Sequence, residues 1–427
     1  MKQILKSIKA HRKQSAALFI EIVIVTIIGW IVIEPVAVDT SMALIPAGYD
    51  YERLVSVTFS NFDYKSEEYD STLNNPTHEK QRLLTLIREH PEVESATYTT
   101  YQTYESGSSS STGFKTDSIH GLEGDDTWIS TYIIQYVPKT DFFSTFGIKD
   151  ANGNPFEEPE VDGKSFIVSK TLAKARYANE SAIGKDLYEY DDKEGHTPIT
   201  GIIHDTPYRK SDGRRQVMIK PVDNDEIGWS VSGVAMRLKE GVSPRVFVDK
   251  LTSDINQYRA GNTYLTHPVL MTDERDAVFA EQSRSLAKGW IILTFFLVNV
   301  ILGVAGTFYI QCRTRTADSG VMRAFGATRH KVEWNIVGEA LLSVVFAWAV
   351  GSILYLAYLT FAHVEFENNA DMIVRMLNPM WFDSAWSRNC IVGGLVLLLL
   401  LVSTLLGVCL PARKIGRVNP VDALRDE

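Results

Sequence analysis

Long apolar blocks alternate with polar blocks along the chain. Four runs are apolar almost throughout and are long enough to cross a hydrocarbon core, which takes roughly 20 residues of helix. The predicted crossings are residues 16–36, 290–311, 336–362 and 390–410. The chain is therefore predicted to be an α-helical membrane protein with four transmembrane helices.

A large mixed block, residues 40–287, separates the first two crossings. The stretch "RLVSVTFSNFD" alternates like a strand, and "PTHEKQRLLTLIREH" places Leu83 and Ile87 on one side of a helix that stops before Pro91. Further strand-to-helix steps follow, one with Ser243 as N-cap and Pro244 as the first helical residue. We predict an α+β domain, in two lobes, inserted between helices 1 and 2. The Ser/Gly-rich residues 106–113 are expected to form a mobile loop or a hairpin turn.

Lys and Arg are concentrated in three short segments: the tail 1–15, the loop 312–335 and the tail 411–427. The loop 363–389 carries mostly acidic charge. Because basic segments stay in the cytoplasm, both tails and the loop 312–335 are predicted to lie inside. Residues 40–287 and 363–389 are then extracytoplasmic. The basic residues before the first crossing also resemble the start of a signal peptide, but its length favours an uncleaved anchor over a cleaved signal.

Charge and cysteine content refine this picture. The outer block is acidic, which makes nucleic-acid binding improbable. The three cysteines, Cys312, Cys390 and Cys409, all lie at edges of predicted crossings. The outer domain must therefore fold by packing, without disulfide bonds.

No catalytic constellation stands out. The chain lacks the glycine-rich phosphate loop of nucleotide-binding proteins, the metal motifs His-Glu-x-x-His and Cys-x-x-Cys, and the motif Gly-x-Ser-x-Gly. The pairs Ser169-Lys170 and His204-Asp205 are weak candidates, since adjacent strand residues point to opposite faces. We predict a non-catalytic chain that binds no metal and no cofactor of its own.

Two acidic residues, Glu21 and Glu339, lie within apolar runs. A carboxylate in a membrane is costly and usually faces the bundle interior or water. Both are near the inner boundary, where snorkelling or pairing with an arginine would lower that cost. A structural or coupling role is favoured over a proton relay, because no chain of further acids is present.

The loop 312–335 combines several basic residues with the apolar Val321, Met322, Phe325 and Val332, whose early members have helical spacing. Gly320 and Gly326 would permit close approach or a tight bend. A short amphipathic helix of this kind is suited to docking in a groove of another protein. The alternative is a basic loop that serves only to fix topology.

The stretch "RTADSGVMRAFGATRHKV" resembles the signature of the MacB/FtsX-type permeases of ABC transporters. The chain departs from that signature at Asp318, Ser319 and Phe325. The ending "LPARKIGRVNPVDALRDE" is similar to the family's C-terminus, and the outer block is similar to its extracytoplasmic domain more loosely. The matching residues of the loop are Arg315, Thr316, Gly320, Val321, Arg323, Ala324, Gly326, Ala327, Thr328 and Arg329.

The resemblance implies that this loop is a coupling helix seated on a separate ABC ATPase dimer, which holds ATP and Mg²⁺. The implied ATPase-contacting residues are Arg315, Asp318, Gly320, Val321, Arg323, Ala324, Phe325, Gly326, Ala327, Thr328 and Arg329. The resemblance also implies a second permease subunit, either identical or paralogous, and an extracytoplasmic partner protein. The chain would cross the bacterial inner membrane several times, in contact with its lipids.

The function implied is mechanotransmission, in which ATP hydrolysis moves the extracytoplasmic domain to export a small molecule or peptide or to handle lipoproteins. Two alternatives stay open. The chain could be a membrane sensor or signalling protein that transports nothing, or a regulator of an extracytoplasmic cell-wall hydrolase.

Overall fold

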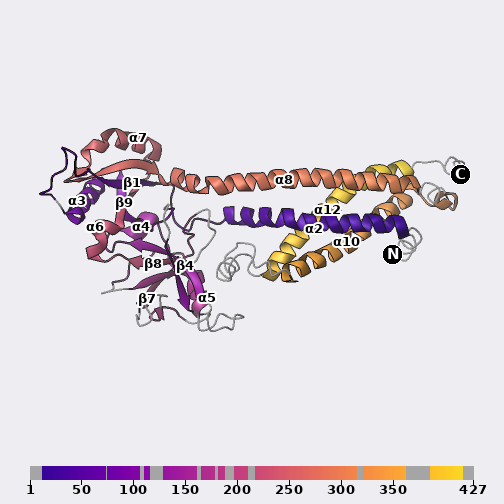
Figure 1. The fold of residues 1–427 in the computed structure, drawn as a ribbon, viewed down its shortest axis with the longest axis horizontal. Helices are drawn as coiled ribbons and strands as arrows, with labels where there is room; N and C mark the ends of the chain where they lie inside the picture. The colour runs from indigo at the N-terminus through magenta and orange to yellow at the C-terminus, as the bar shows by residue number, and fades with distance from the viewer. Residues whose placement is uncertain are drawn as a thin grey trace. The chain divides into compact units, whose positions relative to one another are not determined.

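The computed structural model describes residues 12–73, 75–105, 110–115, 128–160, 165–177, 181–187, 197–209, 217–314, 321–361 and 385–416. They fall into two compact units. Of these residues, the membrane unit comprises those up to Thr40 and those from Arg284 onward, and the outer domain comprises those within Ser41–Ser283. Figure 1 shows long helices in the first and two sheets with short helices in the second.

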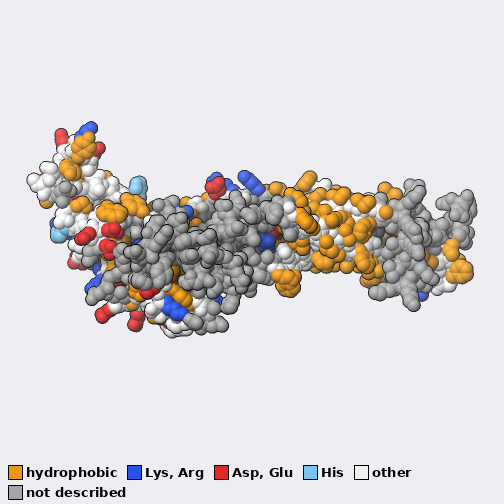
Figure 2. Space-filling view, turned by 60° about the horizontal axis from the view of Figure 1, so that its bottom comes forward, with side chains coloured by type: hydrophobic (Ala, Val, Ile, Leu, Met, Phe, Trp, Pro, Cys, Tyr) orange, Lys and Arg blue, Asp and Glu red, His pale blue; other side chains and the backbone are white. Residues whose placement is uncertain are grey.

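Among the described residues, four helices are long and apolar enough to cross a membrane, and all four contribute to the membrane unit. They are α2 (Arg12–Ala43), α8 (Met271–Thr314), α10 (Arg329–Phe361) and α12 (Ala385–Gly416). Hydrophobic side chains cover much of the surface of these helices (Figure 2). The predicted fold class, four apolar helices with an α+β domain between the first two, is confirmed.

Two helices begin well before the predicted crossings. Helix α8 starts at Met271, inside the block predicted as outer domain, and α10 starts at Arg329 instead of 336. The added residues of α8 are polar, with Asp273 and Glu274 in the first turn, where acids favour the helix dipole. Hydropathy marks only the part of a helix that suits lipid, so it misses polar extensions.

Helix α2 is approached closely by all three other helices, each at a glycine. A Cβ added to Gly351 of α10 would lie 2.8 Å from the Thr26 side chain. The corresponding distances are 3.0 Å from Gly393 of α12 to Trp30, and 2.9 Å from Gly289 of α8 to Val36. Small residues at such points let membrane helices pack through van der Waals contact.

The outer domain contains a five-stranded antiparallel sheet in the order β10-β11-β1-β9-β2. Leu83 and Ile87 of α3 and Phe247 of α7 are buried in its core. These elements agree with the strands and helices predicted there, including Ser243 as N-cap of α7. The bounds are β1 Leu54–Asn61, α3 Pro76–Arg88, β2 Val93–Thr100, β9 Val231–Leu238, α7 Pro244–Asp254, η2 Ile255–Gln257, β10 Arg259–Ala260 and β11 Thr263–Leu270.

The second sheet has six strands in the order β3-β4-β8-β5-β7-β6 and is mixed. The pairs β4/β8 and β5/β7 are parallel, and the others are antiparallel. The bounds are β3 Ser110–Lys115, β4 Trp128–Tyr136, α4 Phe142–Phe146, β5 Phe166–Ser169, α5 Lys170–Tyr177, β6 Asp186–Leu187, β7 Thr197–Ile203, β8 Val217–Pro221, η1 Asn224–Glu226 and α6 Ile227–Ser230.

Part of the Ser/Gly-rich stretch is a strand, contrary to the predicted loop. Residues 106–109 lie outside the described residues, whereas Ser110–Lys115 forms β3 and pairs with β4 in the register Ser110↔Ile133 to Lys115↔Trp128. Serine and glycine have low strand propensity, but pairing with a neighbouring strand overrides local preference. The prediction of a loop or hairpin turn was therefore wrong for residues 110–113.

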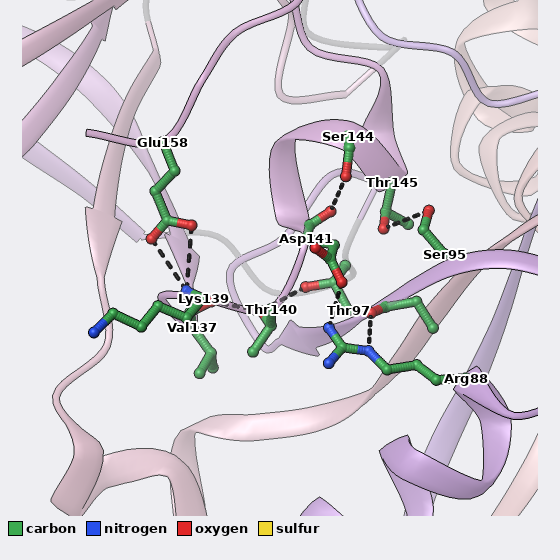
Figure 3. A network of polar contacts seen from close by, with 11 residues as sticks. Arg88, Ser95, Thr97, Val137, Lys139, Thr140, Asp141, Ser144, Thr145 and Glu158 are labelled. Atoms are coloured by element: carbon green, nitrogen blue, oxygen red, sulfur yellow. Dashed lines mark hydrogen bonds and ion pairs between the residues drawn. The ribbon is translucent and has the colours of Figure 1, made fainter. Parts of the chain in front are cut away.

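Polar contacts tie the five-stranded sheet to the segment that follows β4 (Figure 3). The Arg88 guanidinium donates to Asp141 (2.8 Å) and to the Ala96 carbonyl (3.0 Å), and the hydroxyls of Thr97 and Thr140 are 2.9 Å apart. Buried Arg237 of β9 also donates to the Thr145 carbonyl at 2.8 Å and forms an ion pair with Asp50. These bonds fix α4 against the sheet.

Candidate functional site

The predicted coupling segment is described from Val321 onward. Arg315, Asp318 and Gly320 of the predicted site, with Thr316, lie outside the described residues. Among the described residues, 321–324 are helical, and the Phe325 amide donates to the Val321 carbonyl at 3.1 Å. The apolar positions 321, 322 and 325 therefore do lie on a helical turn.

Gly326 ends this turn in the left-handed conformation, with φ of +89°. Its amide donates to the Arg323 carbonyl, and the Ala327 amide donates to the Met322 carbonyl, both at 3.0 Å. This pair of bonds is the Schellman motif, which favours glycine at this position. A Cβ added to Gly326 would meet nothing within 4 Å. The glycine is thus required for its backbone conformation, as the expected bend implies, and not for close packing.

Thr328 then starts the next helix. Its carbonyl accepts from the Val332 amide at 3.2 Å, and its hydroxyl accepts from the Lys331 amide at 3.4 Å, as an N-cap does. The sequence "GATR" is therefore a stop and a start: Gly326 closes one turn and Thr328 opens α10. Residues 329–335, predicted as the end of the coupling loop or helix, belong to α10.

The apolar side chains at the start of this segment are exposed. Phe325 is 88% exposed, Met322 41% and Val321 42%. Trp334, in the second turn of α10, is also exposed. Val332 behaves differently: it is buried within the chain and does not belong to this surface, which corrects its grouping with the other three. We call Val321, Met322, Phe325 and Trp334 the exposed apolar surface.

The same segment carries cationic side chains. Arg329 and Lys331 are exposed and Arg323 is half-buried. The Trp334 indole donates to Nε2 of His330 at 2.9 Å, which holds the ring of Trp334 beside the first turn of α10. An apolar surface bordered by positive charge is suited to a protein groove with acidic edges.

The two predicted intramembrane acids have different settings. Glu21 of α2 accepts from the Thr307 hydroxyl of α8 at 3.1 Å. Glu339 is half-buried in α10, and its carbonyl accepts from the Ser343 hydroxyl at 2.9 Å. Glu21 thus joins two helices.

A third acid, Glu34, was missed by the sequence reasoning. It is buried, accepts from the Tyr355 hydroxyl of α10 at 2.8 Å, and lies 3.5 Å from Nε of Arg388 of α12. Trp30, one turn before it, stacks on Tyr355 and donates to Ser352 at 2.9 Å. The available signal was an acid within the first predicted crossing, directly before Pro35. Its partners, Tyr355 and Arg388, are more than 300 residues away in the sequence, so no local sequence pattern could predict them.

A buried polar cluster also anchors the start of α8 within the outer domain. Glu105 accepts from the Tyr49 hydroxyl at 3.1 Å and lies 3.4 Å from Nε of Arg275. The Arg275 guanidinium also stacks over the Tyr51 ring at 4.2 Å. Burial, reinforced by the Glu105 charge, raises the pKa of Tyr49 well above its usual value. Tyr49 therefore stays a neutral donor.

The weak catalytic candidates have structural partners. The Ser169 hydroxyl accepts from the Val217 amide at 3.2 Å, and Asp205 accepts from the amide and hydroxyl of Thr171. Lys170 donates to the Ala151 carbonyl. Over the described residues, no group of His, Cys, Asp and Glu is arranged to hold a metal ion.

Comparison with known families gives one match. Residues 290–420 match the FtsX-like permease C-terminal family. This range holds most of α8, the segment with the exposed apolar surface, α10 and α12. The resemblance drawn from the signature is thus confirmed for residues 290–420, the C-terminal membrane region. A comparison with curated protein sequences gave no match.

Three solved structures similar to part of the chain are single regions or domains of larger proteins. The periplasmic region of MacB from Actinobacillus actinomycetemcomitans is 17% identical, with a TM-score of 0.32, over 52% of this chain and 90% of that one. The extracellular domain of the noncanonic ABC-type transporter YknZ from Gram-positive bacteria is 10% identical, with a TM-score of 0.28, over 50% and 100%. A domain of a putative permease protein from Porphyromonas gingivalis is 20% identical, with a TM-score of 0.31, over 53% and 97%.

Proposed function

From the FtsX-like permease domain at residues 290–420, we propose that the chain is the transmembrane subunit of an ABC transporter. In this proposal a separate ATPase dimer binds ATP and Mg²⁺ and docks on the exposed apolar surface. Two permease chains pair in the membrane, and the outer domain moves in response to ATP hydrolysis.

The observation that carries the proposal is the exposed apolar surface itself. Phe325, Met322 and Val321 precede α10 on a segment predicted to lie in the cytoplasm, where lipid does not cover them. Burying a side chain of this size yields about 1.5–3 kcal/mol. Exposed apolar side chains next in sequence to cationic ones are typical of a binding site for another protein.

Helix α8 supports the transmission of movement. It is one uninterrupted helix of 44 residues that contributes to both units. Its first turns carry Arg275, held beside Glu105, and its later turns carry Thr307, bonded to Glu21. A continuous helix anchored by side chains at two points transmits a shift with little loss. The cargo under this proposal is a small molecule, a peptide or a lipoprotein.

Pull-down of the ATPase by the full-length chain in mild detergent tests the docking. Phe325→Asp should abolish capture, because it places a charge in the centre of the contact. Trp229→Asp is a matched control, since Trp229 is an exposed aromatic residue of the outer domain. It should capture the ATPase as the unaltered chain does.

Equal capture by both variants would refute docking at this surface. Failure of the unaltered chain to capture any ATPase would instead favour the membrane sensor or signalling protein. Membrane insertion of each variant is checked by cysteine labelling, so a loss of capture can be separated from a failure to fold.

A further inference from the structure

One buried carboxylate joins three helices of the membrane unit. Glu34 of α2 is 5% exposed. Its Oε2 accepts from the Tyr355 hydroxyl of α10 at 2.8 Å, and its Oε1 lies 3.5 Å from Nε of Arg388 in the first turn of α12. A carboxylate within a predicted crossing is costly, and residues of this kind are usually functional. Docking of an ATPase makes no use of it.

The two contacts of Glu34 differ in kind. A hydroxyl 2.8 Å from a carboxylate oxygen is a well-formed hydrogen bond. The 3.5 Å between Oε1 and Nε of Arg388 exceeds the range of about 2.7–3.2 Å for such a bond. Within the described part of the chain, Oε1 of Glu34 accepts no hydrogen bond. Glu34 is therefore bonded firmly to α10 and held to α12 by charge attraction at Oε1.

Helices α2 and α10 are also joined one turn before Glu34. The ring of Trp30 stacks on that of Tyr355, with centroids 5.2 Å apart, and its indole donates to the Ser352 hydroxyl at 2.9 Å. The bond between Tyr355 and Glu34 thus continues a fixed contact. When Arg388 moves, Glu34 can stay in place on α10.

Helix α12 is packed differently at its start and further along. The Gly393 carbonyl accepts from the Trp348 indole of α10 at 3.0 Å, and a Cβ added to Gly393 would lie 3.0 Å from Trp30. In the first turn, by contrast, Trp386 is 76% exposed. Arg388 reaches from this turn back to α2. Its contact with Glu34 can therefore change while the rest of α12 stays packed.

A bend point lies directly beside the contact. Pro35 follows Glu34 inside α2. Proline has no amide hydrogen to donate to the carbonyl four residues earlier, so helices bend at such positions. Helix α2 continues past Pro35 to Ala43, and its last residues belong to the outer domain. A change in this bend would move Glu34 relative to Arg388.

We propose that Glu34 and Arg388 form a reversible latch. When closed, it holds the first turn of α12 against α2 and α10, and a change of the bend at Pro35 opens it. A buried ion pair is weak evidence for stability, since an apolar pair of similar volume is often at least as stable. Opening and closing gives the pair a use that stability does not. The latch goes beyond the proposed function and does not depend on ATPase docking.

Distances between spin labels in the full-length chain test the latch, in lipid nanodiscs without ATPase or nucleotide. The three native cysteines are first replaced by serine. The first label pair, Ile31→Cys with Trp386→Cys, joins α2 to the first turn of α12. The reference pair, Ile31→Cys with Leu398→Cys, joins α2 to the middle of α12. All three positions are exposed, so the labels do not enter the packed interior.

The first label pair should show one main distance and a longer distance populated to about 10% or less. Glu34→Gln should raise the ratio of long to short distances about tenfold, because the amide still accepts from Tyr355 but no longer attracts Arg388 by charge. Glu21→Gln is the matched control. Glu21 lies on the same helix but accepts from Thr307 of α8, so its loss should leave the ratio unchanged. The reference pair should keep one distance throughout.

Charge reversal separates attraction from packing. Glu34→Arg should open the latch, and the addition of Arg388→Glu should close it again, which lost packing alone would not allow. Pro35→Ala restores a helix hydrogen bond and should reduce the long population. A distribution that Pro35→Ala leaves unchanged would overturn the role of the bend.

Two results would overturn the latch itself. One is the same distribution in Glu34→Gln as in the unaltered chain. The other is a shift of both label pairs in that variant, which would mark a general loosening of the helices. Either result leaves the proposed function standing, because ATPase capture is measured separately at the exposed apolar surface.

Discussion

The outer domain buries charged side chains, whereas the segment from Val321 to Trp334 exposes apolar ones. In the outer domain, Arg237, Glu105 and Arg275 are buried beside groups of opposite charge. In the segment, Phe325 and Met322 are exposed, with cationic side chains around them. The first arrangement stabilises the fold of this chain. The second leaves apolar surface for another molecule to cover.

The difference predicts two distinct kinds of mutational effect. Substitutions in the outer domain should change stability, because their side chains already have partners within the chain. Substitutions in the segment should change binding and leave the fold intact. The predictions below test this separation, beginning with the largest expected effect.

Arg323→Glu should reduce ATPase binding on the order of a thousandfold, since charge reversal in a buried protein contact costs several kcal/mol. The unfolding temperature should not change. Binding is measured by titrating the ATPase onto the full-length chain in nanodiscs. A basic segment that serves only topology would lose little from one reversed charge.

Arg237→Ala should lower the stability of the outer domain by about 2–4 kcal/mol, because the Thr145 carbonyl and Asp50 lose a buried cationic partner. Hydrogen exchange of β9 and α4 amides in the full-length chain reports the loss. Arg245→Ala is the control, since Arg245 and Asp273 form an exposed pair at 3.6 Å that is worth below about 1 kcal/mol. Similar losses in both variants would contradict the assignment.

Gly326→Val should strain the turn by about 1–2 kcal/mol, the cost of a left-handed conformation for a residue with a Cβ. Because α10 is held by its own packing, the strain should displace the turn before Gly326 and weaken ATPase binding. Gly241→Val is a control: Gly241 also has positive φ and open surroundings, but lies in the outer domain. If both variants bind the ATPase equally well, the turn does not orient the exposed apolar surface.

The smallest effect concerns His90 of the outer domain. Its Nδ1 accepts from the Glu92 amide at 3.2 Å, and burial lowers its pKa below the ordinary value of 6.5. The unfolded chain therefore binds this proton first. The contribution of His90 to stability is complete above pH 6.5 and declines as the pH falls toward the folded pKa. Hydrogen exchange at β2 should follow this decline, and His90→Gln should flatten it. An unchanged pH profile would exclude His90 as its source.

Much of the fold could be predicted because its determinants are local. Apolar runs long enough to cross a membrane identify the four helices, and Ser243-Pro244 identifies the start of α7. The helix end at Gly326 and the helix start at Thr328 could in principle have been predicted from the preference for glycine at C-caps and threonine at N-caps. They were obscured because the apolar run of α10 begins after the helix does.

Other features depend on contacts between distant residues. β3 forms through pairing with β4, which the Ser/Gly composition conceals. The Glu34 cluster joins three helices whose relative packing cannot be inferred from hydropathy. Of the predicted coupling residues, Phe325 and Gly326 have a described exposure or backbone conformation consistent with their expected role. Their contact with an ATPase remains a prediction.

The most direct test uses two phenylalanines that are almost equally exposed at opposite ends of α10. Phe325, 88% exposed, lies four residues before the first residue of the helix, and Phe361, 84% exposed, is its last residue. Each is replaced by a photoreactive phenylalanine analogue in the full-length chain, which is irradiated in native membranes. We predict that position 325 cross-links to a protein carrying a phosphate-binding loop and that position 361 does not. Equal cross-linking from both positions, or none from position 325, would contradict the account.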